Sequence, residues 1–175
     1  MHAATYFPYA GFSRNVTMNP CPCGYAGDAD GRCHCTPDAI ARYRGRISGP
    51  LLDRVDILSN VPRLPLAELN AQRGARDENS ATVRARVVAA RGLAMRRAGK
   101  PNATLAVREI ERDCVLGDAE RTLLERALEK LSLSARAYHR VLRVARTIAD
   151  LAGSERIARE HLAEAVQYRR INTNV

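Results

Sequence analysis

Four cysteines lie within fifteen residues of this 175-residue sequence, and they are the side chains best suited to chemistry. They form two Cys-x-Cys pairs with nine residues between the pairs: Cys21, Cys23, Cys33 and Cys35. Four thiolates are enough to close a tetrahedral Zn²⁺ site, and the glycines between the pairs let the loop turn back on itself. The sequence therefore predicts a zinc site, in which His34 could replace one thiolate.

Two other interpretations of these cysteines stay open. The thiols could remain reduced on a glycine-rich loop, or they could form a redox switch. A disulfide framework is not expected, because the total of five cysteines is odd and no secretion signal opens the sequence. The fifth, Cys114, lies in a helical pattern and is expected to be a small buried hydrophobic residue.

Positive charge dominates the rest of the composition. The 28 basic residues exceed the 19 acidic ones, and all of the 28 except Lys100 and Lys130 are arginine, which suits bidentate contacts to phosphate. With 46% hydrophobic residues the chain is globular, and no apolar run approaches the roughly 20 residues that span a bilayer. We expect a soluble, cytoplasmic protein with a nucleotide or DNA partner and no membrane partner.

The elements before residue 70 indicate an incomplete α/β unit. A strand is predicted to end at Val16-Thr17-Met18, a helix to begin at Thr36-Pro37-Asp38, and a second strand to run over 55–61. One or two strands cannot form a stable sheet alone. Residues 1–69 therefore resemble part of a larger core.

After a polar linker at 70–80, residues 81–175 carry only helical patterns, so the fold class is mostly α. Apolar spacing, caps and terminal glycines predict a bundle of four or five helices. They run from Val83 to Gly99, over 105–114, from a cap at Asp118, from a cap at Ser134 to Gly153, and over 157–170.

Three motifs occur in order along the chain: Met-Asn-Pro-Cys-Pro-Cys-Gly at 18–24, Ile-Ser-Gly-Pro-Leu-Leu-Asp-Arg-Val-Asp at 47–56, and Ser-Ala-Arg-Ala-Tyr-His-Arg at 134–140. Together they resemble the magnesium-chelatase-like AAA+ ATPases, and more closely their ComM/YifB branch. The resemblance implies a remnant of the AAA+ α/β core in 1–69 and a helical lid in 81–175. It also implies ATP and Mg²⁺ as cofactors, a hexameric ring of subunits, and a DNA helicase that aids branch migration in natural transformation.

The resemblance assigns nucleotide-binding and catalytic roles to three residues. Asn19 matches the sensor 1 residue that positions the attacking water, Arg54 matches the arginine finger offered to a neighbouring subunit, and Arg136 matches the sensor 2 arginine of the lid. Such roles suit phosphoryl transfer, which depends on positioning and on cations near the developing charge. Without the motifs, Asn19 would be a turn residue, Arg54 a surface ion pair, and Arg136 part of a solvated basic face.

The phosphate-binding elements of the family are missing from the sequence. There is no Gly-x-x-x-x-Gly-Lys-Ser/Thr loop, which Gly99-Lys100-Pro101 only imitates, and no apolar strand ends in Asp-Glu. We expect the C-terminal portion of such an ATPase, from a truncated gene, a split reading frame or a fragment, inactive on its own. The alternative function is a stand-alone, zinc-stapled DNA-binding module. A metal-insertion subunit acting on a tetrapyrrole rests on the family name alone.

Overall fold

The computed structural model describes residues 16–28, 30–52, 54–61, 78–131 and 133–169. These residues divide into two compact units, one ending at Ser48 and the other beginning at Gly49. Most of the predicted linker and the predicted last residue of the final helix, Arg170, lie outside the described residues. Among the described helices, none is long and apolar enough to cross a membrane.

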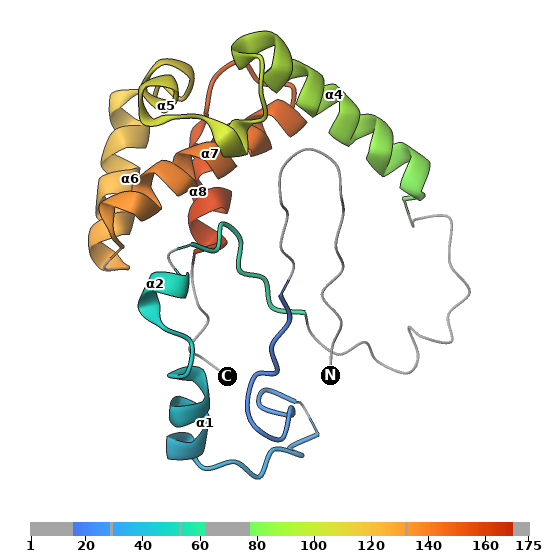
Figure 1. The fold of residues 1–175 in the computed structure, drawn as a ribbon, viewed down its shortest axis with the longest axis vertical. Helices are drawn as coiled ribbons and strands as arrows, with labels where there is room; N and C mark the ends of the chain where they lie inside the picture. Colours follow the sequence, from blue (N-terminus) through green and yellow to red (C-terminus); the bar gives the residue numbers. More distant parts are fainter. Residues whose placement is uncertain (1–15, 29, 53, 62–77, 132, 170–175) are drawn as a thin grey trace. The chain divides into compact units, whose positions relative to one another are not determined.

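The first unit consists of the cysteine loop and one helix, α1 (Pro37–Arg44) (Figure 1). The predicted start of α1 is confirmed: the Thr36 side chain accepts a hydrogen bond from the Ala39 amide, and Pro37 occupies the first helical position. Arg44, the last residue of α1, donates from Nε to the Pro20 carbonyl at 3.1 Å. The helix is therefore fastened to the residue that precedes the cysteine loop.

The two predicted strands are wrong, because the described residues contain no strand. Residues 16–18 have no regular structure, and Val16 is 84% exposed. Residues 55–61 follow the short helix α2 (Gly49–Leu52) as an irregular segment. Their β-branched residues favour a strand, but a strand forms only where another strand pairs with it. Here the Leu58 amide instead donates to the carbonyl of Tyr168, a residue at the end of a helix, at 2.9 Å.

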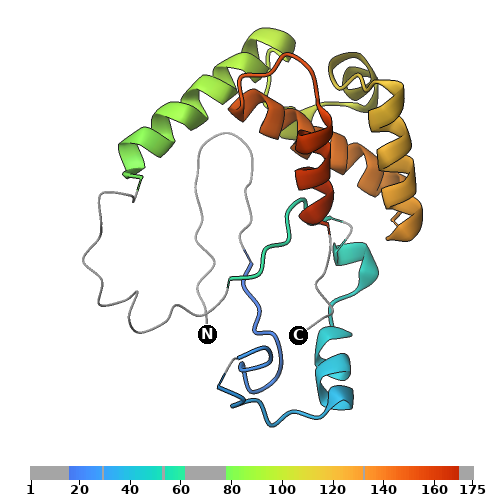
Figure 2. The ribbon, with the colours of Figure 1, turned by 180° about the vertical axis from the view of Figure 1, so that it is seen from behind.

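The second unit is a helical bundle whose central helix is α7 (Figures 1 and 2). Helix α7 packs against α4, the 3-10 turn η1, α5 and α8, while α6 packs against α8. The bounds are α4 (Ser80–Ala98), η1 (Asn102–Thr104), α5 (Val107–Asp113), α6 (Asp118–Lys130), α7 (Ala135–Leu151) and α8 (Arg159–Gln167). The mostly α fold class is therefore confirmed, whereas the division into 1–69 and 81–175 stays a prediction.

Local capping explains where these helices begin and end. The Ser134 hydroxyl accepts from the Ala137 amide at 3.3 Å, which confirms the predicted start of α7. Helix α4 ends at Gly99, whose φ of 67° is the left-handed conformation that glycine tolerates. The predicted cap at Asp118 is displaced by one residue, because Gly117 holds the cap position of α6. Asp118 instead places its charge in the first turn, where the helix dipole favours an anion.

The core of the second unit surrounds the apolar face of α7. Its largest buried apolar side chains come from α5, α6, α7, α8 and the residue after η1: Leu105, Ile110, Leu124, Val141 and Leu162. Small residues on α7, Ala145 and Ala149, are fully buried and allow the neighbouring helices to approach closely. Cys114 is 4% exposed, as predicted, and burial raises its pKa to about 11.

Candidate functional site

The four predicted metal ligands converge in the first unit. The sulfur atoms of Cys21, Cys23, Cys33 and Cys35 all lie within 4.8 Å of one another. Cys33 Sγ lies 3.8 Å from Cys21 Sγ and 3.7 Å from Cys23 Sγ. Four sulfurs at about 2.3 Å from a tetrahedral Zn²⁺ would be ~3.8 Å apart. The donor set and its spacing therefore fit a tetrahedral metal ion.

Tight turns bring the sulfur atoms together. The Gly24 amide donates to the Cys21 carbonyl at 3.0 Å, and the Gly31 amide donates to the Asp28 carbonyl at 3.1 Å. Gly24 has a φ of 85°, a conformation that other residues rarely adopt, so the first turn depends on glycine. Arg32 closes the outer side of the loop, since its Nε lies 2.6 Å from Asp28 Oδ2 and its guanidinium stacks on the Tyr25 ring.

The pKa values divide the four thiols into two groups, since those of Cys21 and Cys23 are lowered and those of Cys33 and Cys35 are raised. Burial opposes ionisation of Cys21, but hydrogen bonds from the Cys23 thiol and the Ala26 amide lower its pKa to about 6. At Cys35, a backbone hydrogen bond from Cys23 favours the thiolate. The side chain of Cys23, burial and the charge of Cys21 oppose it more strongly, so the pKa of Cys35 is raised to about 12. Four thiolates at this spacing repel one another, so a divalent cation is what would stabilise all four together.

Asn19, the predicted sensor 1 residue, is exposed and lies beside the cysteine loop. A β-carbon built on Gly24 would lie 3.6 Å from Asn19 Nδ2, which shows how closely the two residues approach. The first unit therefore holds Asn19 together with the thiol cluster, whereas Arg54 and Arg136 belong to the second unit.

The two predicted nucleotide-contacting arginines are exposed on one bundle. Arg54 follows α2, where its amide donates to the Leu51 carbonyl at 2.9 Å, and Arg136 lies in the first turn of α7. Asp56, two residues after Arg54, forms an ion pair with Arg140, one turn after Arg136. The side chain of Arg169, just beyond α8, donates to the Val55 carbonyl. These contacts anchor residues 55–58 to α7 and α8. The anchored segment directly follows Arg54, and the α7 residue that holds it lies one turn after Arg136.

Other arginines, which sequence reasoning did not single out, serve the interior of the bundle. Arg146 on α7 is 2% exposed and donates to the carbonyls of Ser154, at 2.5 Å, and Glu155, at 2.9 Å. Its Nη2 also lies 3.1 Å from Asp150 Oδ1. A signal in the sequence was available: Arg146 and Asp150 are four residues apart, on the face that also carries Leu142 and Ala149.

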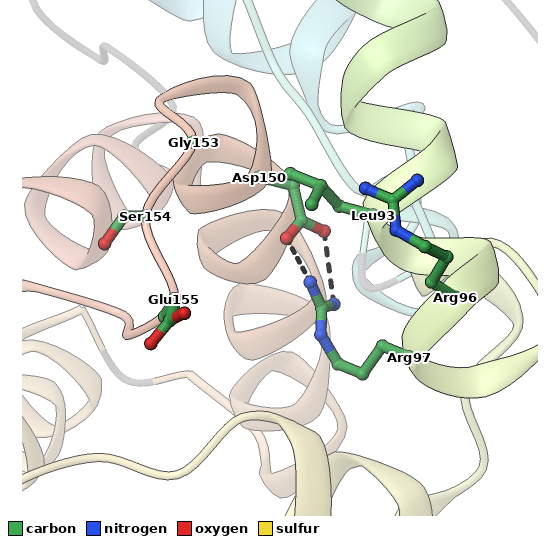
Figure 3. Close-up of a pocket in the computed structure, with 7 residues that line it drawn as sticks. All are labelled: Leu93, Arg96, Arg97, Asp150, Gly153, Ser154 and Glu155. Atoms are coloured by element: carbon green, nitrogen blue, oxygen red, sulfur yellow. Dashed lines mark hydrogen bonds and ion pairs between the residues drawn. The ribbon is translucent and has the colours of Figure 1, made fainter.

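A cavity of about 350 Å³ adjoins this network between α4 and the loop after α7. Figure 3 shows Arg97 of α4 directed at the Asp150 carboxylate, with Arg96, Ser154 and Glu155 around the same space. Asp150 Oδ2 accepts from Arg97 at 3.2 Å and from Asn102 at 2.8 Å. Because Arg146 and Arg97 already neutralise it, this carboxylate is a structural group rather than a base or a metal ligand.

The comparisons with known proteins define the class to which this bundle and cysteine loop belong. Residues 77–169 match the family model described as magnesium chelatase, subunit ChlI C-terminal, and residues 1–69 match the model described as magnesium chelatase, subunit ChlI. The chain belongs to this magnesium chelatase family.

Within that family the chain is a homologue of ComM. It is 49% identical over 168 residues to "Competence protein ComM" of Haemophilus influenzae, covering 96% of this chain. It is 45% identical to YifB of Salmonella typhimurium and 36% identical to Mb2921c of Mycobacterium bovis, over 93% and 91% of this chain. In each case the match spans 32% of the relative, so the chain corresponds to about a third of the length of these proteins.

Proposed function

We propose that this chain supplies the phosphate-sensing residues and the arginine finger of an ATP-driven, ComM-like DNA-remodelling ring. Asn19 orients the attacking water, Arg136 contacts the nucleotide of its own subunit, and Arg54 reaches the nucleotide of the neighbouring subunit. Basic surfaces of the ring contact DNA during branch migration. The sequence carries no phosphate-binding loop, so these residues act only when ATP and Mg²⁺ are bound by elements from outside the chain.

The observation that carries this proposal is the anchoring of the Arg54 segment on α7, which holds Arg136 in its first turn, and on the end of α8. The Asp56–Arg140 ion pair and the Leu58–Tyr168 backbone hydrogen bond fasten that segment to the bundle. Both Arg54 and Arg136 remain exposed and are therefore accessible to a ligand. An arginine that must stabilise charge in a transition state has to be held by its neighbours while its own guanidinium stays free to bind.

The experiment uses full-length Haemophilus influenzae ComM in which the matching third is replaced by this chain. We expect ATP turnover by the chimera and none by this chain alone. Arg54→Ala should lower turnover by at least about a hundredfold, as expected for a finger. Arg136→Ala and Asn19→Ala should lower it as well, while Arg126→Ala, which removes an exposed arginine of α6, should leave it unchanged.

A mixing experiment separates action within a subunit from action between subunits. Arg54→Ala and Arg136→Ala chimeras are combined, so that an interface can contain an intact Arg136 from one subunit and an intact Arg54 from its neighbour. Recovery of part of the turnover supports the proposed assignment. Turnover by this chain alone, or an Arg54→Ala chimera as active as the unsubstituted one, would contradict the proposal.

We also propose that the four cysteines bind one Zn²⁺ per chain as a structural ion. The support is the convergence of the sulfur atoms within 4.8 Å. A metal held by four thiolates has no open coordination position, so the ion stabilises the loop and performs no reaction. Metal analysis should find one Zn²⁺ per native chain and a loss of the ion in Cys33→Ser, with Cys114→Ser as the matched control that retains it.

A further inference from the structure

The first unit contains a basic groove that the proposed nucleotide chemistry does not use. Residues of helix α1 line a space of about 470 Å³ together with one residue just beyond the helix and one residue of the cysteine loop. The lining residues are Pro22, Ala39, Arg42, Tyr43 and Arg46. None of these described lining residues is acidic, so the groove presents two cations beside an aromatic ring.

The arginines at the end of α1 differ in what they contact. Arg44 has a structural role, because its Nε donates to the Pro20 carbonyl at 3.1 Å. Arg42 and Arg46 lie on either side of it in sequence, are exposed and line the groove. The dipole of α1 accounts for a preference for cations at its C-terminus, but it does not account for two arginines on the wall of one groove beside an aromatic ring.

The groove has the chemistry that single-stranded nucleic acid requires. Such sites combine cations that follow the phosphate backbone with an aromatic side chain on which a base stacks. Arg42 and Arg46 provide guanidinium groups suited to bidentate phosphate contacts, and Tyr43 provides the ring. The ring of Tyr43 is half-buried, so it is held in place while part of it stays accessible.

One wall of the groove belongs to the metal loop. Pro22 lies between Cys21 and Cys23, whose sulfur atoms are 3.3 Å apart. A metal ion on these sulfurs would hold Pro22 against α1, and loss of the ion would release that wall. A ligand bound in the groove would therefore depend on the metal.

We propose that the groove of Arg42, Tyr43, Arg46 and Pro22 binds the sugar–phosphate backbone of single-stranded nucleic acid, and that the groove is assembled by the metal on the four cysteines. The metal dependence rests on the zinc site proposed above. The groove itself rests only on the contacts of the first unit. It would give the chain a nucleic-acid contact that is independent of ATP.

The experiment measures the binding of a fluorescein-labelled oligothymidylate to the full zinc-loaded chain by anisotropy, over a series of salt concentrations. The double variant Arg42→Gln/Arg46→Gln should bind at least about tenfold more weakly. Its plot of log affinity against log salt should be shallower by about 1.4, because each lost phosphate contact with a single strand removes about 0.7. Tyr43→Ala should weaken binding about fivefold or more without changing that slope.

Two controls test whether the effect belongs to this groove. Arg84→Gln/Arg91→Gln removes the same charge from exposed positions on α4 and should change affinity and slope much less. Arg42→Lys/Arg46→Lys keeps the charge and should preserve the slope. The zinc content of every variant is measured, so that a loss of the loop's structure is distinguished from a loss of contacts.

Three results would overturn the inference. The first is an absence of measurable binding by the native chain at low salt. The second is an equal loss of affinity in the α4 double variant, which would show that only net charge matters. The third, unchanged affinity after the zinc has been removed with a chelator, would overturn the part of the inference in which the metal assembles the groove. No ATP enters the assay, so failure here leaves the ATPase proposal standing and failure of that proposal leaves the groove standing.

Discussion

Arg146 and Asp150 lie one turn apart on α7, with Nη2 3.1 Å from Oδ1, and the exposed fractions of their side chains are 2% and 1%. Burial lowers the pKa of Arg146, while the charge of Asp150 opposes that shift. The same two residues reach the loop after α7 through the Ser154 and Glu155 carbonyls, and α4 through Arg97. This pair therefore joins three parts of the bundle at one point.

Removal of the shared carboxylate should destabilise the bundle strongly. Asp150→Ala leaves Arg146 buried without its anion, and breaking a buried ion pair in this way costs about 3–5 kcal/mol. Glu125→Ala, an exposed position on α6, should change the free energy of unfolding by less than about 0.5 kcal/mol. Urea denaturation of both variants measures the difference, and a cost below about 1 kcal/mol for Asp150→Ala would show that the pair is replaceable.

The stability contributed by Glu109 should depend on pH. Its Oε2 lies 2.7 Å from Lys100 Nζ and 2.6 Å from the Ala106 amide, and these two hydrogen bonds hold the pKa of Glu109 below its ordinary value of 4.5. A carboxylate with a lowered folded pKa contributes stability that is complete above pH 4.5 and is lost as the pH falls through the folded pKa.

Glu109→Gln should therefore lower the melting temperature at pH 7, and its difference from the native chain should shrink below pH 4.5. The matched control is Glu111→Gln, which changes an exposed residue of the same helix. Thermal unfolding followed by circular dichroism at several pH values measures both. A difference that stays constant into the acid range would mean that the charge of Glu109 contributes nothing.

Alkylation should distinguish Cys114 from the cluster cysteines. In the native chain Cys114 is buried, and burial raises its pKa to about 11, so iodoacetamide at pH 8 should not modify it. In the presence of a chelator, the exposed Cys23 should react while Cys114 stays protected until the bundle unfolds. Mass spectrometry of the peptides reports each site. Early modification of Cys114 would contradict its burial in the core.

The Asp56–Arg140 ion pair should protect the segment after Arg54 from trypsin. Asp56 is 52% exposed and Arg140 is 24% exposed, so the pair contributes at most about 1 kcal/mol. Asp56→Asn should raise the initial rate of cleavage after Arg54 by about two- to fivefold, because that energy no longer opposes opening of the segment. Asp38→Asn, on α1, is the control and should leave this rate unchanged. An unchanged rate in Asp56→Asn would mean that other contacts anchor the segment.

The helices of the bundle could be predicted from the sequence because the signals that define them are local. Ser134 caps α7 and Gly99 ends α4 through contacts within a few residues. The predicted strand over 55–61 was wrong because its stability depends on a partner from another part of the chain. Its backbone groups at Val55 and Leu58 pair with Arg169 and Tyr168, at and just after the end of α8, rather than with a second strand.

The convergence of Cys21, Cys23, Cys33 and Cys35 could be predicted from the sequence, since thiol chemistry and spacing along a short loop are enough to indicate a candidate metal site. The sequence pattern did not separate the arginines that pair inside the bundle from those that face solvent. Arg136 and Arg146 both belong to α7, yet the first is exposed and the second is enclosed with Asp150. The packing of the bundle produces this difference, because the environment of a guanidinium depends on which distant helix and loop pack against it.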